Sequence, residues 1–328
     1  MDPEVSVLLH CAHWRGLLEP QVQVELSERF NRQTDLCLEH HIKEVWAERL
    51  SKEPWLFNGA KFRLHSFCLA PLTHPHYSQS SHESATCDGR ELGLTCYKDY
   101  LGTNWSCQVA ELRRRGEKEL SDPLALLAQP LGVGAVLCTD DGQVVLIRRS
   151  QKVAEAGGLL DIPGGHPEPK VKRTEVCEEQ ISVVMMQQRP DAVVSELFSS
   201  VCAEIRDEVN VPLSSLGAPV LMGVALNHTS AGRPSAEFFV RCSLSSDEVR
   251  NLYWKGGAEA NESTDVVFLS RTEVLQLDGS SPLWSEMCPS AKGAVLLYQT
   301  VKPDVEPTAG KPRRSVNTKD PISTKCSN

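Results

Sequence analysis

Apolar positions are spaced as in helices near the start of the chain and as in short strands further on. Residues 22 to 50 carry apolar side chains at roughly helical spacing, and the polar stretch at 31–35 divides this region into two predicted helices. Residues 55–66 combine an Asn-Gly turn signal with alternating residues, which predicts a hairpin or a sheet edge. Residues 73–91 are rich in Ser, His and Pro and have the composition of a loop.

A β-hairpin is the clearest element of the second half. The runs 131–138 and 144–149 are rich in β-branched and aliphatic residues, and Asp140-Asp141-Gly142 between them tolerates the positive φ of a tight turn. Beyond Lys302 the chain is polar and rich in Pro, Lys and Thr, so the tail 302–328 is predicted to be disordered. Other predicted elements are a helix at 195–211 and short strands at 159–162, 220–226 and 238–242.

Length and composition predict a globular α+β protein. A chain of 328 residues is expected to form about two domains, which we place at 1–127 and 128–301. The chain has no apolar run of about 18 residues, so no membrane span is expected. Its first ten residues have an acidic start and a very short apolar run, which disfavours a signal peptide.

The net charge and the cysteine spacing argue against further classes of protein, namely nucleic-acid-binding and disulfide-rich proteins. The net charge of −9 argues against a basic surface for nucleic acid, although a few arginines would suffice for a small anion. The 12 cysteines are irregularly spaced and form no C-x-x-C pair, which is typical of reduced thiols. We therefore predict a cytoplasmic protein, with the nucleus as a second location.

The predicted helix at 195–211 carries an acidic face. Residues four apart on a helix point in similar directions, so Glu204 and Glu208 lie on one face with Asp207 beside it. Apolar residues such as Phe198 and Ile205 form the opposite face. Clustered carboxylates suit a hard cation such as Mg²⁺ or Mn²⁺. The alternative is a solvated acidic face, which is the more common case for such a helix alone.

The segment Asp161–Pro169 follows a short predicted strand. Its Pro-Gly-Gly sequence lets the backbone approach a phosphate or a metal ion, or simply forms a tight turn. His166 is a candidate donor to a phosphate or sugar oxygen, with a surface histidine as the alternative. Asp161 is a candidate ligand of a base or ribose, with a turn-forming residue at a strand end as the alternative.

Together these two segments resemble the signature of the Nudix hydrolase family, G-x5-E-x7-R-E-U-x-E-E-x-G-U with U aliphatic. Gly165 fits the glycine, and the run 203–211 fits the second half at five positions if Asp counts for Glu. Ala203 replaces the signature arginine and Asn210 replaces the second glycine. Gly165 and Glu204 are 39 positions apart where the family has about fifteen, so an insert lies near 169–194.

This resemblance implies a fold and a metal site. The fold is an α/β/α sandwich at 128–301, preceded by a smaller α+β domain that shapes the nucleotide pocket. Glu204 and Glu208 would hold Mg²⁺, with Mn²⁺ as the second choice, and the general base would be Glu208, Glu204 or Glu168. The family glutamate that precedes these residues aligns with Ser195, so this chain lacks it.

Aromatic segments in the first half of the chain narrow the choice of substrate. The aromatic segments 55–57 and 97–106, taken with 161–169, resemble the Nudix hydrolases that cleave UDP-sugars. The resemblance implies Mg²⁺-dependent hydrolysis of UDP-glucose and UDP-galactose to UMP and glucose 1-phosphate or galactose 1-phosphate. It implies a small-molecule partner, and neither nucleic acid nor a membrane. The substrate-binding residues that it implies are Phe57, Tyr97, Arg149, Ala154, Asp161, His166, Glu168 and Ser290.

For several of these residues, an ordinary structural role is the alternative to substrate binding. Arg149 alternates in direction with Arg148, so only one of them can clamp a diphosphate, and a surface charge on an edge strand is an equal alternative. Phe57 and Tyr97 would cover a uracil face, or else pack in a core. Ser290 would close the pocket, or else cap a helix.

Two other functions stay open. The same fold could act on a different nucleoside diphosphate derivative, such as ADP-ribose or coenzyme A. It could also have lost catalysis and kept a binding role, because Ala203 and Asn210 depart from the signature.

Overall fold

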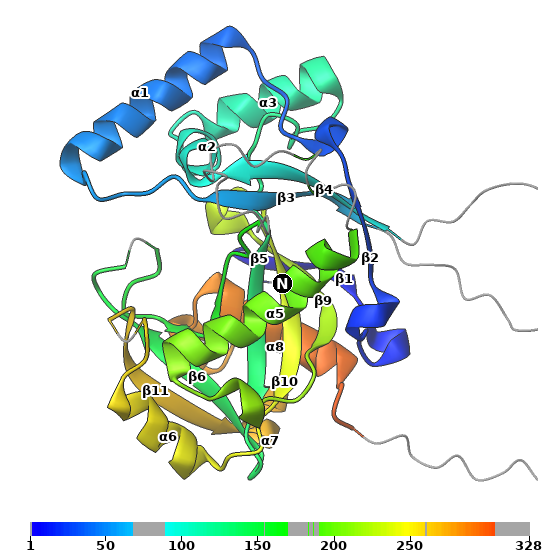
Figure 1. The fold of residues 1–328 in the computed structure, drawn as a ribbon, viewed down its shortest axis with the longest axis vertical. Helices are drawn as coiled ribbons and strands as arrows, with labels where there is room; N and C mark the ends of the chain where they lie inside the picture. The colour runs from blue at the N-terminus through cyan, green and yellow to red at the C-terminus, as the bar shows by residue number, and fades with distance from the viewer. Residues whose placement is uncertain are drawn as a thin grey trace, which may run out of the picture.

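A mixed β-sheet between helices forms the centre of the protein, and a small second sheet lies at one end beside the helices of residues 36–52, 97–102 and 109–120 (Figure 1). The computed structural model describes residues 2–67, 89–153, 155–169, 183, 186, 190–259 and 261–305. The strands are β1 (Val5–His10), β2 (Gln23–Leu26), β3 (Ala60–Phe67), β4 (Gly89–Cys96), β5 (Gly132–Cys138), β6 (Gln143–Arg149), β7 (Leu160–Asp161), β8 (Gly164–Gly165), β9 (Val220–Asn227), β10 (Arg233–Arg241) and β11 (Ser263–Ser270). The helices are α1 (Leu36–Lys52), α2 (Tyr97–Gly102), α3 (Val109–Leu120), α5 (Pro190–Val209), α6 (Ser246–Lys255), α7 (Arg271–Gln276) and α8 (Pro289–Val301). These elements confirm the predicted α+β class.

The large sheet has the order β1-β9-β10-β5-β6-β11, with β7 paired to β6 and β8 paired to β5. Its central pair, β10 and β5, is parallel, whereas β5 and β6 are antiparallel and form the predicted hairpin. The short strand β8 places Gly164 opposite Gly134. The predicted strands at 159–162, 220–226 and 238–242 correspond to β7, β9 and the end of β10.

Two hydrophobic cores cover the two faces of this sheet. Side chains alternate along a strand, so Val133 and Leu137 of β5 pack in the core that contains the buried face of α5. Val136 of the same strand packs in the core that contains α8. Figure 1 shows α5 in front of the sheet and α8 behind it. This arrangement is the predicted α/β/α sandwich.

The prediction of a helix at residues 22–30 is wrong. Val22, Val24 and Leu26 are buried and alternate with exposed Gln23 and Glu25, which is the period of a strand. Val24 and Leu26 belong to β2, which runs parallel to β4, and a 3₁₀ turn follows. The second expected helix exists as α1, whose first turn is capped by the side chain of Asp35.

The N-terminal segment does not form one separate unit. β1 pairs antiparallel with β9 in the large sheet, and β2 packs on α5. The first strand of the N-terminal region thus belongs to the large sheet. The domain boundary at residue 127 stays a prediction. Within the described part of the chain, no helix has the length and apolar character needed to cross a membrane.

Some expectations concern residues that the structure leaves undescribed. Most of the predicted loop at 73–91, most of the insert at 169–194 and residues 306–328 of the tail lie outside the described residues. By contrast, residues 55–66 are all described, and this predicted hairpin or sheet edge contributes β3, the edge strand of the small sheet beside β4.

Candidate active site

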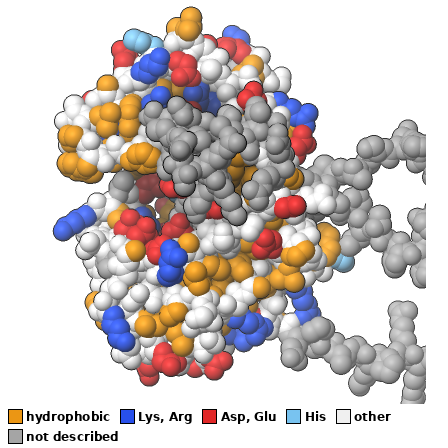
Figure 2. Space-filling view, in the orientation of Figure 1, with side chains coloured by type: hydrophobic (Ala, Val, Ile, Leu, Met, Phe, Trp, Pro, Cys, Tyr) orange, Lys and Arg blue, Asp and Glu red, His pale blue; other side chains and the backbone are white. Residues whose placement is uncertain are grey.

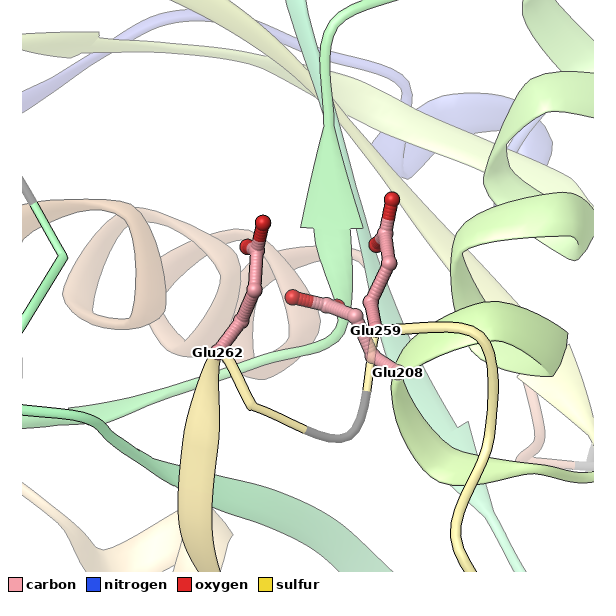
Figure 3. A group of neighbouring side chains, drawn as sticks. All are labelled: Glu208, Glu259 and Glu262. Atoms are coloured by element: carbon pink, nitrogen blue, oxygen red, sulfur yellow. The ribbon is translucent and has the colours of Figure 1, made fainter. Parts of the chain in front are cut away.

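Three glutamates from two segments meet beside the large sheet. Oxygen atoms of Glu208, Glu259 and Glu262 lie within 4.8 Å of one another. Figure 3 shows the Glu208 carboxylate, from α5, between the side chains of Glu259 and Glu262. Hard oxygen ligands at this spacing suit a divalent cation, because like charges at such distances repel unless a cation or protons neutralise them. We call these three residues and Glu204 the carboxylate cluster.

Backbone hydrogen bonds hold the two later glutamates in place. The amide of Glu259 donates to the carbonyl of Asp207 near the end of α5, at 3.0 Å. The carbonyl of Glu262 accepts from the amide of Ser150, which follows β6, at 2.8 Å. The segment before β11 is thus bound to both α5 and β6, and it carries its carboxylates to the predicted helix face.

The Pro-Gly-Gly segment and the acidic helix come together as the sequence implied. The amide of Gly164 donates to Oε2 of Glu208 at 2.8 Å, and Glu208 is buried. A Cβ atom at Gly165 would collide with the carboxylate of Glu204, so only glycine leaves that side chain its place. The insert between the two segments does not prevent this contact.

Burial and mutual repulsion make protons bind tightly here. Burial and, after it, the charges of Glu259, Asp207 and Glu262 raise the pKa of Glu204 to about 7. Burial raises the pKa of Glu208 well above its usual value, and the Gly164 hydrogen bond opposes this only partly. A cation would replace these protons, so the chemistry of the donor set fits a divalent metal ion.

The departures from the family signature have local explanations. Asp207 bonds to the neighbouring Arg206, with Nε to Oδ1 at 2.7 Å, and lies outside the three-carboxylate group. Arg206 therefore does not take the place of the missing arginine through any hydrogen bond that the structure records. Asn210 has φ of +63°, the left-handed conformation that commonly ends helices, which explains why it can replace glycine. The helix consequently ends at Val209, before the predicted Val211.

A cavity of about 420 Å³ opens beside the carboxylate cluster, lined by residues of β5, β8, β9, β10 and the start of α8. Figure 2 shows acidic side chains gathered in a hollow on the corresponding face of the molecule. Three predicted substrate residues line the cavity as one connected group. Asp161 accepts from Arg149 at 3.1 Å and from the hydroxyl of Ser290 at 2.9 Å. Ser290 therefore does not cap α8, whose N-cap residue is Cys288.

His166 also lines the cavity, beside an ion pair that the sequence did not indicate. Arg233 donates to Nε2 of His166 at 2.7 Å and to Glu155 at 3.1 Å. A guanidinium can only donate, so this histidine is neutral. Burial lowers the pKa of His166 well below its usual value, and the nearby Arg233, Lys61 and Arg149 lower it further.

Other predicted site residues lie outside the cavity lining. Glu168 is half-exposed and pairs with Lys61 at 2.7 Å. Phe57 is 60% exposed in the segment before β3. Tyr97 packs edge-on against Trp46 and stacks on Tyr100. Ala154 lies outside the described residues. The roles of all four stay predictions.

Sequence reasoning missed several residues of the site. Glu259 and Glu262 stand three apart in a Gly-rich loop, a pattern too common to single out. A clearer signal was available for Glu237, which interrupts the apolar run of β10 and is fully buried. A charged residue at a core position indicates either a structural partner or a ligand.

A glycine substitution tests the contact between the two signature segments. Gly165→Ala should lower kcat/KM about 10- to 100-fold, because the new Cβ would displace the Glu204 carboxylate. Folding should survive, since the displaced atoms are the end of a flexible side chain. Gly279→Ala is the matched control, because a Cβ there meets nothing within 4 Å. Equal activity of both variants would contradict the placement of Glu204.

Comparisons with known proteins give the relatives of this chain. No family model matches the chain. The chain is 48% identical over 302 residues to uridine diphosphate glucose pyrophosphatase NUDT22 of Homo sapiens, covering 92% of this chain and 94% of that protein. The NUDT22 protein of Bos taurus is also 48% identical, with 92% and 99% covered.

A more distant relative carries the Nudix name. Nudix hydrolase 9 of Arabidopsis thaliana is 32% identical over 287 residues, which cover 86% of this chain and 89% of that protein. Among solved structures, the MutT protein of Methanosarcina mazei Go1 is similar over 52% of this chain and 91% of its own, with 13% identity and a TM-score of 0.31. On its identity to NUDT22 and Nudix hydrolase 9, the chain belongs to the Nudix hydrolase family.

Proposed function

We propose that this protein hydrolyses UDP-glucose and UDP-galactose to UMP and the hexose 1-phosphate, with Mg²⁺ as the preferred metal ion and Mn²⁺ as a substitute. The observation that carries the proposal is the 48% identity, over almost the whole of both chains, to proteins named uridine diphosphate glucose pyrophosphatase. The carboxylate cluster beside a polar cavity supports it, because a diphosphate at the cluster would leave room for a further group in the cavity.

Different residues of the site would bind the metal ion, bind the phosphates and accept the proton. Glu204, Glu208, Glu259 and Glu262 would hold the metal ion, which when bound offsets charge on the diphosphate and activates water. Arg149 is oriented by Asp161, which accepts from Nη1, and by the carbonyl of Glu155, which accepts from Nε. Its Nη2 group donates no recorded hydrogen bond within the described residues and would bind phosphate oxygens. Water attacks one phosphorus atom and the P–O–P bridge breaks. The proton of the water passes to a carboxylate, for which Glu204, Glu208 and Glu168 are the candidates.

A substrate panel tests the proposal. Purified protein with Mg²⁺ is incubated with UDP-glucose, UDP-galactose, ADP-ribose and coenzyme A, and products are separated by anion-exchange chromatography. We expect UMP and hexose 1-phosphate from both UDP-sugars, and no turnover after a chelator removes the metal ion. Rapid cleavage of ADP-ribose or coenzyme A without cleavage of the UDP-sugars would show that the proposed substrates are wrong and that the fold acts on another nucleoside diphosphate derivative. Absence of turnover on every compound, with Mg²⁺ or Mn²⁺, would favour a binding role.

A further inference from the structure

Glu237 is a glutamate of the cavity that forms no ion pair within the described part of the chain. Its side chain is fully buried in the middle of β10, and it lines the cavity. Neither carboxylate oxygen has a hydrogen-bond partner of good geometry among the described residues, although the hydroxyl of Ser235 lies close by on the same face. An unpaired buried carboxyl group costs folding free energy, so a protein retains one mainly where a ligand uses it.

Small residues open the space in front of this carboxyl group. Glu237 stands opposite Gly134 on β5 and opposite Gly223 on β9. A Cβ atom at Gly134 would lie 2.5 Å from Oε2 of Glu237, so even alanine would crowd the carboxyl group. Ser235, the next residue on this face, stands opposite Gly132 and Ala225. Ser235 and Glu237 are thus polar groups on a floor of small residues.

Two other acidic groups of the cavity differ from Glu237 because each forms an ion pair with an arginine. Asp161 pairs with Arg149, and Glu155 pairs with Arg233. Burial and the charge of Asp161 raise the pKa of Glu237 to about 8, against the opposing effects of the Ser235 hydroxyl and Arg233. The protonated group can donate one hydrogen bond and accept others. An anionic phosphate is a poor occupant beside so many carboxyl groups, whereas a neutral hydroxylated group suits them.

The lining also favours a sugar over a base. A base is generally held between aromatic faces, and the described lining of the cavity contains one large aromatic side chain, Trp105, which is 43% exposed. Gly164, which binds Glu208, lies two strands from Glu237 through Gly134, a separation of about 10 Å. That span allows a phosphate at the carboxylate cluster and an attached hexose above the floor.

We propose that Glu237 is a specificity-determining residue that hydrogen-bonds hydroxyl groups of the hexose, with Ser235 beside it. The inference rests on the proposed function, since it assigns part of the cavity to the sugar of a nucleotide sugar. It predicts that affinity for the sugar depends on Glu237, whereas affinity for the nucleoside diphosphate does not.

Calorimetry without added divalent cation and kinetics with Mg²⁺ test this assignment. Glu237→Leu removes the polar group at similar size, and Glu237→Gln retains a donor and an acceptor. For Glu237→Leu we expect kcat/KM for UDP-glucose to fall about 10- to 100-fold, with an unchanged Kd for UDP. Glu237→Gln should recover part of the loss. The melting temperature of Glu237→Leu should not fall, because an unpaired buried carboxyl group is being removed.

The outcomes separate this inference from the proposed function. Equal weakening of UDP and UDP-glucose, or unchanged UDP-glucose kinetics, would overturn the role of Glu237. Native protein that binds UDP-glucose more tightly than UDP, loses this difference in Glu237→Leu and cleaves neither UDP-sugar would contradict the proposed function alone. Native protein that binds neither compound would overturn both.

Discussion

Glu208→Gln should lower kcat/KM for UDP-glucose by about a thousandfold at saturating Mg²⁺. Glu208 is the buried member of the carboxylate cluster, and a metal ion contributes several kcal/mol of charge stabilisation to the transition state. Glutamine keeps an oxygen to accept the hydrogen bond from Gly164 and removes a buried charge. The fold should therefore be retained, and the loss should appear in steady-state kinetics rather than in the melting temperature.

Asp207→Asn is the matched control for this experiment. Asp207 is the neighbouring carboxylate of the same helix, but it pairs with Arg206 and lies outside the three-carboxylate group. Its loss should change kcat/KM by less than about fivefold, the scale of a partly exposed ion pair. If Asp207→Asn were as damaging as Glu208→Gln, the metal ion would be bound differently from the arrangement in Figure 3.

Metal-free protein should lose stability at the cluster as the pH rises. The pKa of Glu204 is raised from its ordinary value of 4.5 to about 7, and burial also raises the pKa of Glu208 well above 4.5. The folded state therefore binds more protons than the unfolded state between these values, so the free energy of unfolding falls as the pH rises through this range. Below the ordinary value both states are protonated, and this contribution vanishes.

A divalent cation should reverse the trend. Cations and protons compete for the same carboxylates, so Mg²⁺ should raise the melting temperature more at pH 8 than at pH 5. At about 100 times Kd the stabilisation is about 2.7 kcal/mol. The measurement is thermal unfolding at both pH values, with and without Mg²⁺.

The double variant Glu204→Gln with Glu208→Gln serves as the reference for this titration. Other carboxyl groups, such as Asp35 with its lowered pKa, change stability in the opposite direction in both proteins. Subtracting the pH dependence of the double variant from that of the native protein leaves the contribution of the carboxylate cluster to stability. An identical pH dependence in the two proteins, or an Mg²⁺ effect of equal size at both pH values, would contradict the assignment.

Local patterns allowed much of the fold to be predicted, and they were wrong where two periods overlapped. The hairpin of β5 and β6 followed from two β-rich runs around an Asp-Gly turn. Residues 22–30 also contain apolar side chains at helical spacing, yet Val22, Val24 and Leu26 alternate as a strand because β4 offers a partner. That partner lies more than sixty residues further along the chain, beyond the reach of local spacing.

By itself the sequence determined which residues share a helix face and which segments can turn tightly. Glu204 and Glu208 had to lie together because the geometry of a helix is local, and Gly164-Gly165 had to allow close approach because these residues lack a Cβ atom. Only the tertiary structure decided that these segments meet, that Glu259 and Glu262 join them and that Glu237 faces a cavity. Those contacts depend on strand order and on backbone hydrogen bonds between segments far apart in the chain, which spacing along a single segment cannot specify.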